Sequence, residues 1–233
     1  MQTEFRDREK CYYCYRPKSS CMCEHVHTID TQTKFIILMH PKEFKKVKNG
    51  TGHLTHLSLK NSELFIGIDF TNHKEINEII ATHESFVLYP SKDAINLSDT
   101  NSHATFPHPK STSSLTLTAH ANQFPHAKKM AIFIIDSTWA CSLKMLRESK
   151  NLQALKHISF ESTKLSQFKI KEQPAEYCLS TIESTLEVLE LLNVWHVERL
   201  EKEDLAMFLN PFHTMIAYQL ECIENSSRQA VRF

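Results

Sequence analysis

The chain has 233 residues, of which 41% are hydrophobic and 23% charged, and its formal net charge at pH 7 is zero. This length allows one good core, or one core plus a small appendage. No run approaches the ~20 apolar residues of a membrane span, and no signal peptide is expected from the polar start MQTEFRDREK. We therefore expect a cytoplasmic protein that does not bind a membrane.

The zero net charge hides an asymmetry along the chain. Residues 1–175 contain 23 Lys and Arg against 17 Asp and Glu, whereas residues 176–233 contain 4 against 10. A basic body suits an anionic partner, but an excess of this size is equally typical of solvated surface charge. Charge alone therefore leaves both readings open.

Four of the seven cysteines lie between residues 11 and 23, in the pattern Cys-x2-Cys-x6-Cys-x-Cys. In a reducing compartment such a cluster favours metal over disulfides, and four thiolates can close a tetrahedral zinc site. We predict a structural zinc knuckle over residues 1–32, with His25 and His27 as spare donors. Its predicted ligands are Cys11, Cys14, Cys21 and Cys23. The segment has few large apolar residues, so the metal would supply most of its stability.

The main domain is expected to begin with a strand over 34–40, followed by a lysine-rich loop. Lys42, Lys45, Lys46 and Lys48 precede the small-residue stretch Asn49-Gly50-Thr51-Gly52. Lysines beside such a loop suit contact with phosphates, and a solvated lysine face explains them equally well. A helix carrying Leu54 and Leu57 should follow, then a strand over 64–69 and a helix over 74–82.

Two further predicted strands end in polar residues. The strand over 85–90 leads into Pro90 and Ser91, and an unbroken apolar strand over 130–135 ends at Asp136. Ligands bind at the carboxyl ends of strands in α/β proteins. The candidates there are Pro90, Ser91, Asp136, Ser137, Thr138 and Trp139. Ser137 or Thr138 can cap a helix that turns Leu143 and Leu146 inward, and a second reading is that Asp136 and Thr138 only cap this helix while Trp139 fills the core. With only three glycines and neither GxGxxG nor a Walker loop, no Gly-rich nucleotide site is expected.

The rest of the chain should contain one loop-like insertion and further α/β elements. Residues 98–126 are rich in Ser, Thr, His, Asn and Pro with little periodicity, which predicts a surface insertion. A short strand is expected within 154–160. A helix should begin near 179–183, where Ser180, Thr181 and Glu183 either cap it or bind a ligand. The last helix is expected over 203–223, interrupted at Pro211.

Alternating strands and helices predict an α/β domain with a largely parallel sheet. The chain resembles the DTW-domain family. This family is named for an Asp-x-Thr-Trp motif at the end of a strand, which here is Asp136 to Trp139. Each motif is weak alone, but the ordered set is specific. The other matching motifs are the four cysteines with Arg16-Pro17, His40-Pro41-x-Glu43, Thr51-Gly52-x-Leu54, Asn61-Ser62, Tyr89-Pro90-Ser91 and Leu179-Ser180-Thr181-Ile182-Glu183.

Members of this family are tRNA-uridine aminocarboxypropyltransferases. The resemblance implies transfer of the 3-amino-3-carboxypropyl group of S-adenosylmethionine to N3 of a tRNA uridine, giving acp3U and methylthioadenosine. It also implies a SPOUT-like catalytic domain over 33–233 with a C-terminal knot, a feature otherwise almost absent from proteins. Two alternatives remain open: a SPOUT-type RNA methyltransferase, and a non-catalytic zinc-knuckle module that binds RNA.

The resemblance suggests roles for individual residues. Asp136 is expected to be a general base or an orienting, electrostatic group, with Thr138 and Trp139 beside it. Trp139 is expected in the core rather than stacked on a ligand. The expected cofactor-binding residues are Pro90, Ser91, Asp136, Ser137, Thr138, Leu179, Ser180, Thr181 and Glu183. The expected tRNA-binding residues are Lys42, Lys45, Lys46, Lys48 and Thr51, together with the zinc knuckle. The sequence indicates no obligate protein partner.

Overall fold

The structure is a computed structural model that describes residues 9–46, 50–99, 129–168, 170 and 178–230. Within these residues six strands form one sheet in the order β2-β1-β5-β3-β6-β4, and every pairing between neighbours is parallel. The strands are β1 (Lys34–Met39), β2 (Ser62–Ile66), β3 (Glu84–Leu88), β4 (Ile95–Asn96), β5 (Met130–Asp136) and β6 (Lys156–Ser159). The predicted α/β class with a largely parallel sheet is confirmed.

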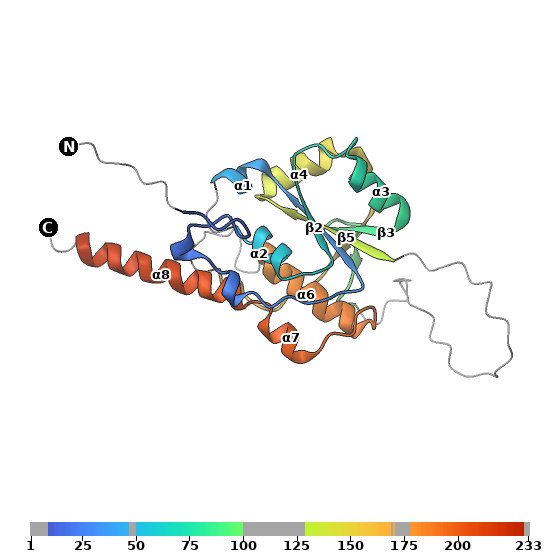
Figure 1. Ribbon diagram of the computed structural model, residues 1–233. Helices are drawn as coiled ribbons and strands as arrows, with labels where there is room; N and C mark the ends of the chain where they lie inside the picture. Colours follow the sequence, from blue (N-terminus) through green and yellow to red (C-terminus); the bar gives the residue numbers. More distant parts are fainter. Residues whose placement is uncertain (1–8, 47–49, 100–128, 169, 171–177, 231–233) are drawn as a thin grey trace.

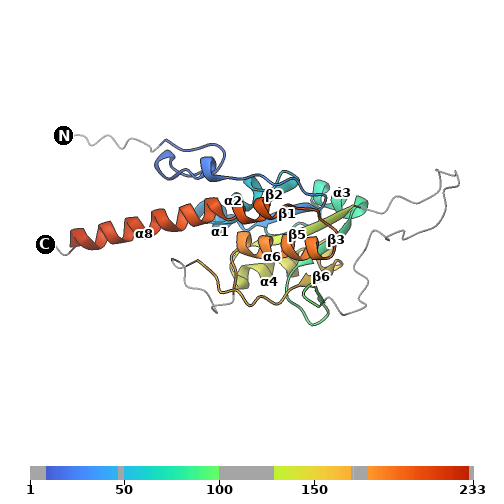
Figure 2. The same ribbon diagram turned by 90° about the horizontal axis from the view of Figure 1, so that it is seen from below.

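Helices cover both faces of the sheet, as Figure 1 shows. The helices α3 (Lys74–Thr82), α4 (Trp139–Glu148) and α5 (Lys150–Gln153) pack on one face. The helices α2 (Gly52–Leu57), α6 (Thr181–Val194) and α8 (Asn210–Ala230) pack on the other. The remaining helical elements are η1 (Lys18–Ser20), η2 (Cys23–His25), α1 (Pro41–Lys46) and α7 (Lys202–Met207). In Figures 1 and 2 the far end of α8 extends beyond the rest of the domain.

The alternation of side chains along β5 determines where its last residue points. Ile132 and Ile134 belong to the core beneath α2, α6 and α8, whereas Ala131 and Phe133 belong to the core beneath α3 and α4. Successive side chains of a strand point to opposite faces. Asp136 is therefore directed to the face that carries α2 and α6, at the carboxyl end of the central strand.

The four-cysteine segment packs directly on this domain. Met22 is 2% exposed and belongs to the same core as α6 and α8, and η2 contacts α8. Farther along, Ile29 also lies in that core, and it forms a parallel bridge with Leu59. The segment is thus joined to the domain by apolar contacts as well as by the chain.

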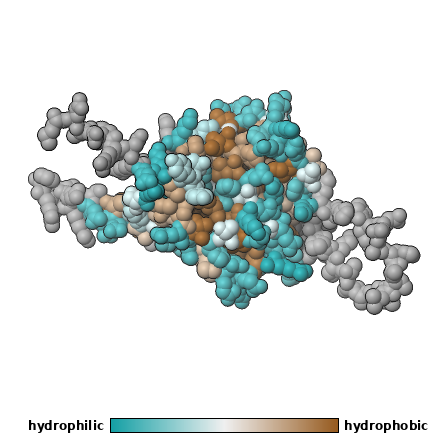
Figure 3. Space-filling view, viewed as in Figure 1, coloured by the Kyte–Doolittle hydropathy of each residue, from teal (hydrophilic) through white to brown (hydrophobic). Residues whose placement is uncertain are grey.

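The outer surface is mixed in character. In Figure 3 hydrophilic residues predominate at the margins of the face, and hydrophobic residues gather toward its middle. Across the part of the chain that the structure describes, none of the helices combines the length and the apolar character needed to cross a membrane.

Two predictions for the first half of the domain are wrong in detail. The second strand covers 62–66 rather than 64–69. The lysine-rich segment, expected as a loop, forms α1, because Pro41 at its first position suits a helix start and Glu43 places a negative charge in the first turn. The predicted insertion over 98–126 lies, apart from residues 98 and 99, outside the described residues, as does Lys48.

Two predictions for the helices are also wrong in detail. The last helix was expected to end at residue 223 but continues to Ala230, whereas its expected interruption at Pro211 is confirmed, because α7 ends at Met207 and α8 begins at Asn210. In α4, Leu146 is buried as predicted, but Leu143 is 59% exposed. The C-terminal knot implied by the family resemblance stays a prediction.

Partly buried histidines should make the fold sensitive to acid. Burial lowers the pKa of His56 in α2 and of His83 before β3 below the ordinary value of 6.5. At pH values between the lowered pKa and 6.5, these histidines bind more protons in the unfolded chain than in the folded one. The free energy of unfolding should therefore be fully retained above about pH 6.5 and decrease as the pH falls below it.

Denaturant titrations at about pH 7.5 and about pH 5.5, with zinc in excess, measure this dependence. The double variant His56→Gln/His83→Gln should lose less stability between the two pH values than the parent protein does. Equal losses in the two proteins would show that these histidines do not contribute to the acid sensitivity.

Candidate active site and metal centre

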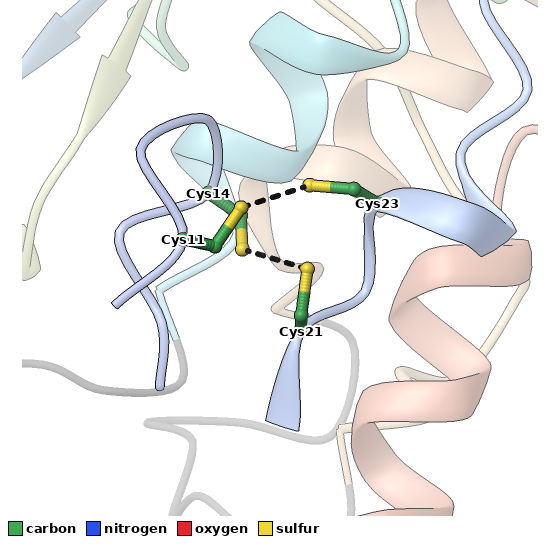
Figure 4. A group of neighbouring side chains, drawn as sticks. All are labelled: Cys11, Cys14, Cys21 and Cys23. Atoms are coloured by element: carbon green, nitrogen blue, oxygen red, sulfur yellow. Dashed lines mark hydrogen bonds between the residues drawn. The ribbon is translucent and has the colours of Figure 1, made fainter. Parts of the chain in front are cut away.

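The four cysteines form a compact cluster, drawn in Figure 4. The Sγ atoms of Cys11 and Cys23 lie 3.7 Å apart, as do those of Cys14 and Cys21. All four Sγ atoms lie within 4.8 Å of one another. A tetrahedral zinc site with Zn–S bonds of about 2.3 Å has S···S edges of about 3.8 Å, whereas a disulfide needs about 2.05 Å. The donor set therefore fits a zinc ion and fills all four positions.

The environment of the thiols is consistent with metal binding. Backbone N–H groups of Cys14 and Tyr13 lower the pKa of Cys11 to about 6, so this thiol is largely ionised at neutral pH. Burial raises the pKa of Cys21 and of Cys23. Because a metal binds the thiolate form, zinc uptake would release the protons of these two thiols.

Arg16 connects the cysteine cluster to the rest of the protein. Its side chain is buried, which lowers its pKa, whereas the nearby thiols of Cys14, Cys21 and Cys23 oppose this shift. Its guanidinium donates to the carbonyl oxygen of Gly50 at 3.3 Å and to the sulfur of Met215 in α8 at 2.9 Å. A positive charge is thus held between the cluster and the loop that precedes α2.

A cavity of about 640 Å³ opens at the carboxyl edge of the sheet. It lies where β3, β5 and β6 end and where α4 and α6 begin, which is the usual ligand position of parallel α/β sheets. Its polar lining includes Glu43, Thr51, Asp136, Ser137, Thr138, Ser180 and Thr181, and its apolar lining includes Leu88, Tyr89, Pro90, Trp139, Phe160 and Phe168.

Asp136 lies at the wall where β5 meets α2 and α6. Its side chain is 6% exposed, and Oδ1 accepts a hydrogen bond from the hydroxyl of Thr181, the first residue of α6, at 2.6 Å. Gly52 approaches from α2 so closely that a Cβ atom there would lie 2.4 Å from Oδ2 of Asp136. The carboxylate is held by three elements distant in sequence, as a group with a defined orientation requires.

The motif residues after Asp136 have different surroundings. The Ser137 hydroxyl forms a hydrogen bond with that of Ser142 at 2.8 Å. Thr138 caps α4 in an extended conformation, and its side chain makes no capping hydrogen bond. Trp139 is 44% exposed and packs edge-on against Tyr89 with ring centroids 6.0 Å apart. The expected core position of Trp139 is therefore wrong, because the first turn of α4 projects it onto the cavity wall.

Of the other predicted cofactor-binding residues, four line the cavity, and Ser91 and Glu183 lie outside its lining. Pro90, Leu179, Ser180 and Thr181 line the cavity. The hydroxyl of Ser91 instead forms a hydrogen bond with Nδ1 of His157 at 3.0 Å, and Ser91 is not part of the lining.

Glu183 supports the cavity from behind. Its carboxylate is 5% exposed and accepts hydrogen bonds from the backbone N–H and hydroxyl of Ser180, the backbone N–H of Gln167 and the hydroxyl of Ser166. It thereby ties the start of α6 to the segment that carries Phe168, a residue of the cavity lining.

Glu43 and the cavity aromatics were given no role in the sequence analysis. Glu43 is 8% exposed and lines the cavity, which places a second carboxylate there. It appears in the sequence only within His40-Pro41-x-Glu43, and that strand-end motif was the one available signal. Tyr89 belongs to the family motif Tyr89-Pro90-Ser91, whereas Phe160 and Phe168 carry no sequence signal beyond lying at or after a predicted strand.

The predicted tRNA-binding residues do not form one group. Lys42 and Lys45 are exposed on α1, whereas Thr51 is 4% exposed and lines the cavity. The structure brings Thr51 to the predicted active site rather than to the lysine face. The side chain of Lys46 lies outside the described part.

Comparison with known proteins places the chain among related sequences. The family profile of the DTW domain matches residues 8–220. A curated protein of Drosophila melanogaster named tRNA-uridine aminocarboxypropyltransferase 2 is 26% identical over 95% of this chain and 80% of its own length. Proteins of the same name from Macaca fascicularis and Mus musculus are 24% and 23% identical over 92% of this chain. The match spans 64% of the length of these two relatives. No solved structure matches the chain significantly.

Proposed function

The chain belongs to the DTW-domain family, and we propose that it is a tRNA-uridine aminocarboxypropyltransferase. In this proposal it transfers the 3-amino-3-carboxypropyl group of S-adenosylmethionine to N3 of a tRNA uridine in the cytoplasm. The observation that carries the proposal is the cavity at the sheet edge, in which Asp136 is held by α6 and α2. A reducing compartment suits the four-thiolate zinc site.

The cavity suits S-adenosylmethionine in size and in chemistry. A volume of about 640 Å³ lies within the range of small-molecule sites, which is roughly 300–1,000 Å³. Tyr89, Pro90 and Phe160 offer an apolar wall for an adenine ring. Asp136 and Glu43 place negative charge where a sulfonium and an α-amino group need it, and the positive end of the α6 dipole favours a carboxylate.

When bound, the cofactor supplies an electrophilic γ-methylene carbon next to a sulfonium. Attack by uracil N3 on this carbon would break its bond to sulfur and release methylthioadenosine as a neutral thioether, and Asp136, Ser180 and Thr181 are among the residues that would hold the cofactor. The N3 proton has to leave, and we assign its removal, or the orientation of N3, to the Asp136 carboxylate. The hydrogen bond from Thr181 fixes the orientation of the Asp136 carboxylate at the cavity wall.

Other side chains position the cofactor in this proposal. Ser137, Thr138, Ser180 and Thr181 line the cavity and would bind the amino-acid or ribose groups of the cofactor, with Leu179 and Pro90 completing the wall. Trp139 is exposed enough to stack on a ligand, which now favours stacking over the expected core role. Ser91 and Glu183 act through His157 and through the start of α6, respectively.

The anionic tRNA would contact the exposed lysines of α1. Lys42 and Lys45 have no ion-pair partner among the described residues, so their charge is available to phosphates. Phosphate contacts of this type position a nucleic acid without reading its sequence. Thr51 lies deeper, at the cavity, where it would meet the target nucleotide rather than the backbone.

The test is nucleoside mass spectrometry of unmodified tRNA incubated with the zinc-loaded protein and S-adenosylmethionine. The expected product is a uridine heavier by one aminocarboxypropyl group, together with an equal amount of methylthioadenosine. A methylated nucleoside with S-adenosylhomocysteine would replace the proposal by an RNA methyltransferase. Unchanged tRNA would favour the non-catalytic RNA-binding module.

A further inference from the structure

Exposed aromatic side chains lie on the first cysteine turn, between Cys11 and Arg16, and on α1. Tyr12, Tyr13 and Tyr15 are 90%, 74% and 56% exposed, and Phe44 of α1 is 39% exposed. Rings of this size bury about 150–250 Å² each when they are covered, so several exposed rings in one region mark an interaction surface. We call these four side chains the aromatic platform.

Part of the aromatic platform is held in a fixed arrangement. The rings of Tyr15 and Phe44 meet edge-on with centroids 5.7 Å apart, and the ring of His53 lies 5.0 Å from Tyr15 and 5.7 Å from Phe44. Tyr15 has a φ of 58°, in the left-handed region that residues other than glycine seldom adopt. Such conformations persist where the surroundings determine them and are frequent at functional sites. Tyr15 and Phe44 thus hold a fixed arrangement while both remain partly exposed.

The aromatic platform adjoins the cavity wall. Phe44 follows Glu43, which lines the cavity. Arg16, the neighbour of Tyr15, donates to the carbonyl oxygen of Gly50, which also lines it. A long ligand with one unit in the cavity can therefore continue over Tyr15 and Phe44.

Positive charge surrounds the same entrance. Lys42 and Lys45 flank Phe44 on α1, and both are exposed. Burial has the largest effect in lowering the pKa of His40; Lys42 and Lys144 of α4 lower it further, and Glu43 opposes them. The occupant of this surface should be an anion that also offers flat apolar faces.

We propose that the aromatic platform stacks unpaired tRNA bases next to the target uridine, while Lys42 and Lys45 contact the phosphates between them. The inference builds on the proposed function, because it assumes that the uridine occupies the cavity. Unpaired RNA bases are recognised by stacking on aromatic side chains, and single-strand sites combine such rings with cationic grooves. An acidic protein would use the lysines without needing the open ring faces.

The test compares the double variant Tyr12→Ala/Tyr13→Ala with Tyr12→Phe/Tyr13→Phe, which keeps the rings. The control is Leu165→Ala, since Leu165 is 64% exposed and lies outside the aromatic platform. We expect the alanine pair to raise the Kd for an unmodified tRNA transcript by about 5- to 150-fold per lost stack. Zinc content and melting temperature should stay unchanged in both variants, and the phenylalanine pair should bind tRNA like the parent protein.

A second variant tests the platform from a different element. Phe44→Ala in α1 should weaken tRNA binding in the same direction, while a fully paired RNA hairpin should bind the parent and the variant equally. Equal tRNA affinity of the parent protein and the alanine variants, or no tRNA binding by the parent, would overturn the proposal. Preferential loss of binding to phosphatidylserine vesicles instead of tRNA would reassign the surface to a membrane.

Binding and transfer separate this inference from the proposed function. If the parent protein modifies tRNA but the alanine variants bind it normally, the aromatic platform is refuted and the enzyme stands. If the parent binds tRNA through the aromatic platform but transfers no group, the enzyme is refuted and the platform stands.

Discussion

Replacement of Asp136 by asparagine is expected to abolish measurable transfer, with a loss of about 10²- to 10⁴-fold if the carboxylate removes the N3 proton. Asparagine has the same shape but cannot accept a proton at neutral pH. The side chain is buried, at the end of the central strand and beside Thr181 and Gly52. Initial rates of acp3U formation, followed by nucleoside mass spectrometry, measure the effect.

The two roles open to Asp136 predict different pH profiles. If it is the base, the residual rate of Asp136→Asn should rise with pH, because hydroxide then takes the proton. If it only orients the substrate or attracts the sulfonium, the profile should keep its shape at a lower rate. Unchanged melting temperature and zinc content are the required controls, and the exposed Asp93→Asn is the matched variant. Full activity in Asp136→Asn would remove this residue from the mechanism.

The supports of Asp136 should matter less than the carboxylate itself. Thr181→Val removes a hydrogen bond to a charged group, which is typically worth about 1.5–3 kcal/mol, so a loss of about 10- to 150-fold is the upper range. Gly52→Ala would bring a Cβ atom within 2.4 Å of Asp136 Oδ2 and must displace the carboxylate or the helix. Both variants should affect the rate of transfer more than the affinity for tRNA.

The sheet was predictable because its strongest signals are local. The apolar run of β5 and the alternation of strands with helices indicate a parallel α/β domain, and the structure confirms this. Strand order was not predictable, since β5 inserts between β1 and β3 through pairings that join distant parts of the sequence. Likewise, α1 was missed because a lysine-rich stretch fits a loop as well as a helix.

The candidate site was predictable to the level of strand ends and no further. Asp136 and Thr181 are each plausible cap residues in the sequence, and only the fold brings them to 2.6 Å. The capping alternative for Glu183 is confirmed, because Glu183 forms a capping box with Ser180 and also binds the segment at 166–167, whereas it is absent from the cavity lining. Trp139 was expected in the core because large rings usually are buried, whereas here it forms part of a cavity wall.

Loss of the zinc site is the second change expected to have a large effect. Structural zinc contributes on the order of 10 kcal/mol in small motifs. Cys14 is the most buried of the four ligands, at 4% exposed, and Cys14→Ser should abolish stoichiometric zinc binding and lower the melting temperature. Metal analysis and thermal unfolding measure these effects independently of activity. The exposed Cys222 lies outside the cluster, so Cys222→Ser should retain zinc.

The cysteine cluster should also affect the cavity, although none of its four cysteines lines the cavity. Without the four-thiolate cluster, Arg16 loses the negative charges that favour its buried position, and its hydrogen bond to Gly50 at the cavity wall should weaken. The edge-on contact between the rings of Tyr15 and Phe44 should loosen at the same time. We therefore expect Cys14→Ser to weaken tRNA binding by at least as much as the aromatic variants do, and to slow transfer even at saturating tRNA. A zinc-free variant with normal tRNA affinity and normal transfer would show that the cluster is a passive appendage.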